Sequence, residues 1–335
     1  MASLWLILIV VVAALFFDYV NGFHDTANAI ATTVLTGALS IPKAILLAAT
    51  LNFLGAFLNE AVATTIGKGI VDPHTITLPT VLAALIGAII WNLMTWWKGL
   101  PSSSSHALIG GIVGAVIARH GWTVFHFAGL KLIALALLLS PILGMIVGHL
   151  SMIALFWIFR HTSPGKLNRI FKVLQVLSAS AMALSHGSND AQKTMGLITM
   201  ALVSAGFYKI PAGTHFPVPF WVIVSCALAM ALGTAGGGWR IIKTVGRNVL
   251  TLQPVQGCAA ETSGAAVILL ATALGAPVST THVVSSAVMG VGSAQGLAGV
   301  RWNIVKQIVF AWILTLPASA LIAAFFSWGL AHFLG

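Results

Sequence analysis

Residues 4–39 read LWLILIVVVAALFFDYVNGFHDTANAIATTVLTGAL, an apolar run that carries one polar motif, Gly22 to Ala29. A second run, residues 173–205, carries the motif GSNDAQKT at Gly187 to Thr194. A straight helix of either length would exceed about 45 Å, whereas the hydrocarbon core of a bilayer is roughly 30 Å thick. Both motifs contain residues that end helices or tolerate unusual backbone angles. We therefore expect each run to cross a membrane as a helix broken at its motif.

The composition predicts an all-α polytopic membrane protein. Of the 335 residues, 59% are hydrophobic and 7% are charged, whereas a soluble domain carries about 25% charged residues. So few charges cannot cover a water-facing surface, and the long unbroken apolar runs fit spanning helices rather than barrel strands. The net charge of +10 lies mostly in loops, so it indicates orientation in a bilayer and no nucleic-acid partner. Cys226 and Cys258 lie in or beside apolar segments and are interpreted as packing residues.

About ten apolar elements follow one another along the chain. They are residues 4–39, 44–66, 79–97, 101–118, 131–159, 173–205, 219–238, 256–274, 277–297 and 303–333. The longest polar break, RHTSPGKLNRIFK, divides the chain into residues 1–159, a basic cytoplasmic linker at 160–172, and residues 173–335. Each part holds five elements, and the third and fourth element of each part can form a re-entrant hairpin instead of two full spans.

The basic residues predict the orientation. With the N-terminus outside and one crossing per element, the inside holds Lys43, Lys98, Arg160, Lys166, Arg169, Lys172, Arg240, Lys243, Arg247, Arg301 and Lys306. The outside then holds only Lys68, Arg119, Lys131 and Lys209. Since cytoplasmic loops carry the excess of Lys and Arg, we expect an inner (plasma) membrane protein with both termini outside. Five crossings per part also give the two parts opposite orientations.

A second pair of motifs repeats in the same order as the first. Residues 101–106 read PSSSSH and residues 277–282 read PVSTTH, which share the pattern P-x-S-[ST]-[ST]-H. Each follows the Asp of its part, Asp25 or Asp190, by a similar interval. Two different motifs repeating in order predict two inverted repeats, and motif-interrupted segments at matching positions indicate a transporter site at their interface.

The hydroxyl-rich segments suit an oxyanion. Proline followed by hydroxyl residues is typical of a helix start, where free N–H groups and the helix dipole favour negative charge. One such run is most simply an ordinary helix cap, but its mirrored partner favours an anion site. The predicted anion-binding residues are Ser102, Ser103, Ser104, Ser105, Ser279, Thr280 and Thr281.

Three of the six acidic residues fall in apolar surroundings: Asp25, Asp190 and Glu261. A charge in the bilayer interior costs a few kcal/mol, so each needs a partner or a function. The structural alternative is an ion pair such as Asp25 with Lys193. Asp18 and Glu60 have no assigned role at this stage. His24, His106 and His282 also stay open, and no Cys/His spacing matches a zinc site.

At these motifs the sequence resembles the PiT family of inorganic phosphate transporters. That family carries a duplicated G-x-N-D-V-A-N-A signature and a Pro-Ser-Thr-His segment in each half, and its bacterial low-affinity branch carries FHDTANA and SHGSNDAQK. The resemblance implies phosphate–cation symport, an inverted-repeat helical fold and often a homodimer. It also implies that Asp25 and Asn28, Asn189 and Asp190, and Glu261 serve the coupling cation, and that the hydroxyl-rich segments bind phosphate.

One departure from the family bears on the coupling ion. Lys193 stands where the counterpart of Asn28 is expected, and His24 stands where Asn is commoner. A fixed ammonium in place of a sodium ligand favours proton coupling, with phosphate possible as a neutral complex with a divalent metal. The alternative is that Lys193 reaches an interface and sodium binds in the first half.

Other function classes stay open with less support. Sulfate is the main alternative oxyanion, although a nearby carboxylate acceptor favours protonated phosphate. A membrane enzyme acting on a phosphorylated lipid would need a charged catalytic cluster near one interface, and no G-x-S-x-G is present. A passive channel fits duplicated, broken helices less well than alternating access does. We expect a transporter, with no enzymatic activity and no resident cofactor.

Overall fold

The computed structural model describes residues 4–211, 216–237, 252–296 and 300–334. They form helices joined by short loops, with one isolated bridge between Val71 and Phe125. The helices are α1 (Leu4–Leu35), α2 (Ile41–Gly55), α3 (Ala61–Gly69), α4 (Leu78–Lys98), α5 (Ser104–His120), α6 (Phe127–Phe159), α7 (Pro164–Ser204), α8 (Phe220–Gly236), α10 (Pro254–Ala273), α11 (Thr280–Ser293) and α12 (Trp302–Leu334). The expected inside residues Arg240, Lys243 and Arg247 lie outside the described part of the chain.

The helices are those of a multi-pass membrane protein. Five of them, α1, α4, α6, α10 and α12, are long and apolar enough to cross a bilayer, and α2 and α8 are shorter apolar helices. Large apolar side chains on α6 and α12 point outward, among them Leu138 at 65% exposure and Leu321 at 73%. In water such surfaces would aggregate, whereas acyl chains cover them at no cost.

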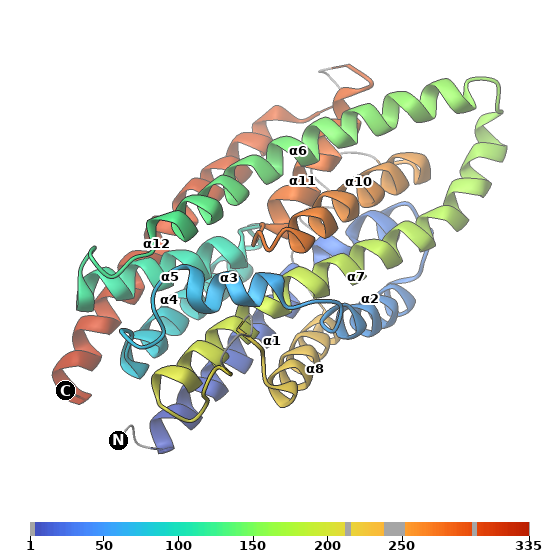
Figure 1. Cartoon of the computed structure of the whole chain (residues 1–335). Coiled ribbons are helices and arrows are strands. Elements are labelled where there is room, and N and C mark those ends of the chain that lie inside the picture. Colours follow the sequence, from blue (N-terminus) through green and yellow to red (C-terminus); the bar gives the residue numbers. More distant parts are fainter. Residues whose placement is uncertain (1–3, 212–215, 238–251, 297–299, 335) are drawn as a thin grey trace.

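The expected breaks at the first pair of motifs are wrong. α1 and α7 run as continuous α-helices of 32 and 41 residues through Asp25 and Asp190. Side chains from other helices contact the aspartate and asparagine side chains of both motifs, so the backbone of both helices stays hydrogen-bonded. α7 also begins at Pro164, so most of the basic segment 160–172 forms its first turns, and Figure 1 shows α7 running along the length of the molecule.

A break occurs instead in the expected span 44–66, which forms α2 and α3 with a non-helical link between them. Gln192 on α7 caps the start of α3, because its Oε1 accepts from the backbone N–H groups of Val62 (2.8 Å) and Ala63 (3.2 Å). The Glu60 carboxylate accepts from the N–H of Val218, 2.9 Å away. Both side chains therefore fasten the link to the second half of the chain.

The two halves pack against each other in reciprocal pairs of helices, in which each contact recurs with the corresponding helices of the two halves swapped. α1 packs on α8 and α7 on α2, while α5 packs on α12 and α11 on α6. The motif glycines lie at the first two crossings, where a Cβ on Gly22 would stand 2.3 Å from Met230 O and one on Gly187 would stand 2.2 Å from Asn52 O. Only glycine permits such close approach, so each motif begins where two backbones touch.

Candidate functional site

The hydroxyl-rich segments begin two helices with the same cap. Ser103 Oγ accepts from the N–H of His106 at 3.1 Å before α5, and Ser279 Oγ accepts from the N–H of His282 at 3.2 Å before α11. These are ordinary Ser caps, and each satisfies one free N–H group at its helix start. All seven predicted hydroxyl residues, Ser102–Ser105 and Ser279–Thr281, are buried.

The two helix starts lie side by side. Ser105 Oγ donates to the carbonyl of Val278 at 3.0 Å, so α5 contacts the segment just before α11. The rings of His106 and His282 are 4.3 Å apart at their centroids. Two positive helix ends from different halves therefore face one small region, which is where an oxyanion is best stabilised.

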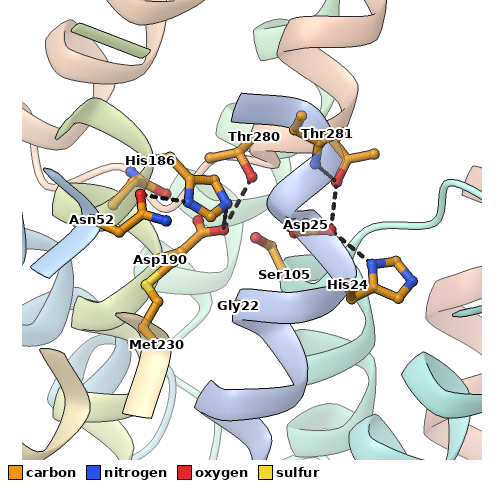
Figure 2. A network of polar contacts seen from close by, with 12 residues as sticks. Gly22, His24, Asp25, Asn52, Ser105, His186, Asp190, Met230, Thr280 and Thr281 are labelled. Atoms are coloured by element: carbon orange, nitrogen blue, oxygen red, sulfur yellow. Dashed lines mark hydrogen bonds and ion pairs between the residues drawn. The ribbon is translucent and has the colours of Figure 1, made fainter. Parts of the chain in front are cut away.

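Neighbouring threonines join this region to the two motif carboxylates. Thr281 donates to Asp25 Oδ1 at 3.3 Å, and Thr280 donates to Asp190 Oδ2 at 3.0 Å. Asn28 Nδ2 donates to Thr281 Oγ1 at 2.9 Å. Figure 2 shows Asp25 on α1 and Asp190 on α7 facing each other, with Ser105 of α5 beside them.

The carboxylates and one histidine converge. One ligand atom from each of Asp25, His186 and Asp190 lies within 4.8 Å of the others, and all three side chains are buried. This arrangement can hold a cation between the halves. His186 did not enter the sequence interpretation, although its place four residues before Asp190 puts both on one helix face.

Each carboxylate has its own basic neighbour. His24 Nδ1 lies 2.7 Å from Asp25 Oδ1, and its Nε2 lies 3.2 Å from the hydroxyl of Thr95 on α4. Lys193 forms an ion pair with Asp190 and donates to Ser105 Oγ (2.6 Å) and Val278 O (2.9 Å). Lys193 is 2% exposed, so the alternative that it reaches an interface is wrong. The ion pair of Lys193 is with Asp190, not with Asp25.

Asn189 and Glu261, two expected coupling residues, form their hydrogen bonds away from Asp25 and Asp190. Asn189 Nδ2 donates to Thr272 on α10 at 2.7 Å. Glu261 on α10 accepts from Thr32 (2.5 Å), Thr33 (2.6 Å), Gln175 (3.1 Å) and Ser178 (2.5 Å), drawn from α1 and α7. Glu261 thus connects α1, α7 and α10. Its partners on α1 lie two helical turns beyond Asp25.

The hydroxyls of the first helix start have different partners. Ser102 donates to Thr95 Oγ1 at 2.7 Å. Ser104 Oγ is buried and has no hydrogen-bond partner among the described residues, which leaves its hydroxyl available to a ligand. Nearby, a cavity of about 440 Å³ opens between α4 and α12, with Thr95, Lys98 and Lys306 in its wall. Apolar side chains, among them Trp91, Phe310 and Leu314, form most of the rest of its wall.

Comparisons with known proteins identify relatives over nearly the whole chain. A family model described as the phosphate transporter family matches residues 21–323. The chain is 47% identical over 321 residues to a protein of Bacillus subtilis (strain 168), covering 95% of each chain. It is 48% identical over 315 residues to one of Rhizobium meliloti (strain 1021), covering 94% of this chain and 93% of that one. Both are named probable low-affinity inorganic phosphate transporters.

A solved structure extends this similarity to the fold. A chain titled the sodium-dependent phosphate transporter superposes with a TM-score of 0.90 at 27% sequence identity. The match covers 98% of this chain and 100% of that chain.

Proposed function

The chain belongs to the phosphate transporter family, and from that premise we propose that it imports inorganic phosphate by symport with protons. The observation that carries the choice of ion is the buried ion pair of Lys193 with Asp190. A fixed ammonium already neutralises the carboxylate that a sodium ion would need. Protons can therefore move through the site while Lys193 keeps the place of the missing cation.

The proposed phosphate site lies between the starts of α5 and α11. The hydroxyls of Ser102 to Ser105 and Ser279 to Thr281 supply neutral donors, and the helix N-termini supply free N–H groups. Among these seven residues, Ser104 has a buried hydroxyl without a hydrogen-bond partner in the described part of the chain. The carboxylates of Asp25 and Asp190 can accept a hydrogen bond from protonated phosphate, which favours phosphate over sulfate.

The proposed transport cycle uses two inverted repeats, residues 1–159 and 173–335, joined by the basic segment 160–172. The exchanged packing of α1 on α8 and α7 on α2 supports this division, because a twofold relation requires such pairs. Alternating access then rocks one half against the other around the shared site. We place both termini outside an inner (plasma) membrane, with two copies forming a homodimer.

Two other coupling cations have specific support. The solved relative is titled sodium-dependent, and Asp25, Asn28 and Asn189 remain as candidate sodium ligands. The convergence of Asp25, His186 and Asp190 supports a divalent metal carried together with phosphate as a neutral complex. Glu261 would serve any of these cations from its position on α10, where it contacts Thr32 and Thr33 of α1.

Radiolabelled phosphate uptake into proteoliposomes tests the proposal. We expect accumulation in sodium-free buffer when a proton gradient points inward, and no competition from sulfate. Chelation of divalent metals would abolish this uptake if the substrate were a metal–phosphate complex. Uptake that appears only after sodium is added would contradict proton coupling. Lys193→Asn should convert proton-driven uptake to sodium-stimulated uptake.

A further inference from the structure

Asp18 is a buried acid that the site above does not use. It lies on α1 seven residues before Asp25, so the two share a helix face at roughly 10 Å along the axis. Its side chain is 0% exposed. Neither carboxylate oxygen has a hydrogen-bond partner in the part of the chain that the structure describes.

The surroundings of Asp18 contain acceptors that lack a donor. Asn21 Oδ1, one turn along the same helix, and Thr194 Oγ1 on α7 are also buried without hydrogen-bond partners among the described residues. The hydroxyl of Thr194 and the thiol of Cys226 on α8 lie close enough to act on the carboxyl group, although neither meets hydrogen-bond geometry with it. The charged groups that act on Asp18 from α7 are Asp190 and Lys193.

The other three buried acids of the described core all have partners. Asp25 has His24 and Thr281, Asp190 has Lys193 and Thr280, and Glu261 has four donors. A bare carboxylate inside a membrane is expensive and binds a proton or cation instead. A sodium ion needs several oxygen ligands arranged around it, whereas a proton on Asp18 needs one acceptor.

We propose that Asp18 is a separate proton-binding site that carries one coupling proton in addition to those handled by Asp25 and Asp190. This inference rests on the proposed proton symport. The proton comes from water on one side of the membrane and forms an O–H bond at the Asp18 carboxyl group. The carboxylic acid then donates to Thr194 Oγ1 or Asn21 Oδ1, and the proton returns to water on the other side when the helices rearrange.

The test measures protons moved per phosphate. In sodium-free proteoliposomes clamped at zero membrane potential, the phosphate accumulation ratio is recorded at several imposed pH gradients. Each coupled proton contributes about a tenfold accumulation per pH unit. The slope of the logarithm of this ratio against the pH gradient gives the number of coupled protons. We expect Asp18→Asn to lower this slope by one, and so the ratio by about tenfold per pH unit. Asp72→Asn, the same change in a loop carboxylate, should keep the wild-type slope.

Phosphate–phosphate exchange, which moves no net protons, shows whether the Asp18→Asn protein is folded and binds phosphate. An Asp18→Asn protein that exchanges phosphate and keeps the wild-type slope would overturn the inference. A wild-type protein that transports no phosphate would instead overturn the proposed function. For a variant that does not fold, carbodiimide labelling of the wild-type protein replaces it. Labelling of Asp18 that falls as pH rises is expected, and none at any pH refutes the site.

Discussion

The two motif regions share their framework and differ in their charges. In both, a glycine lies at a helix crossing, an aspartate follows three residues later, and a threonine of α11 donates to that aspartate. The basic neighbour differs, because Asp25 has a histidine and Asp190 has a lysine. An ammonium can only donate hydrogen bonds, whereas an imidazole has two ring nitrogens that can donate or accept. The two motif regions thus share a scaffold, whereas their different basic neighbours make the two carboxylates unequal.

The largest effect is expected where the halves are most alike. Gly187→Val should prevent assembly, because its Cβ would stand 2.2 Å from the backbone oxygen of Asn52. Overpacking that side chains can relieve costs about 1–3 kcal/mol, and here the obstacle is the backbone of a packed helix, so the cost should be well above that range. Gly22→Val should act equally, whereas Gly165→Ala, with open space around its Cβ, should not. The yield of monodisperse protein in detergent measures this, and a normal yield for one motif variant alone would break the equivalence.

The next largest effect is a loss of stability that is specific to the second motif. Lys193→Met leaves the Asp190 carboxylate buried without its cation, and breaking such a pair costs about 3–5 kcal/mol when its charges cannot adjust. Thermal unfolding in detergent measures this cost. The double variant Asp190→Asn/Lys193→Met should recover most of the stability, and failure to do so would mean that Lys193 acts mainly through Ser105 and Val278.

A smaller effect concerns the anion. Ser104→Ala removes one unused buried hydroxyl, and a hydrogen bond to a charged ligand contributes about 1.5–3 kcal/mol. We therefore expect the KM for phosphate to rise roughly 10- to 100-fold with little change in stability. Ser180→Ala is the matched control, because among the described residues that hydroxyl donates only to the Val176 carbonyl of its own helix. An unchanged KM would place phosphate elsewhere.

Much of this arrangement was predictable from the sequence because it depends on local chemistry. The caps at Ser103 and Ser279 follow from a proline and hydroxyl residues at a helix start, and the repeated pattern indicated that the two starts belong together. The break in α1 was wrongly predicted, since tertiary hydrogen bonds satisfied the motif without unwinding it. The contacts of His186, Thr95 and Asn189 were not predictable, because they depend on how distant helices rotate against each other.

The smallest effect is expected from His24→Asn, which gives the first motif the more usual G-x-N-D form. Asparagine can still donate to a neighbouring carboxylate, so the loss for one altered hydrogen bond is about 0.5–1.5 kcal/mol. Folding should therefore survive, while the imidazole beside Asp25 is lost. We expect proton-driven uptake to slow, although phosphate–phosphate exchange continues. His74→Asn in the exposed loop is the control. If His24→Asn changed stability as much as Lys193→Met, the two basic neighbours would be equivalent, and the contrast between the halves would fail.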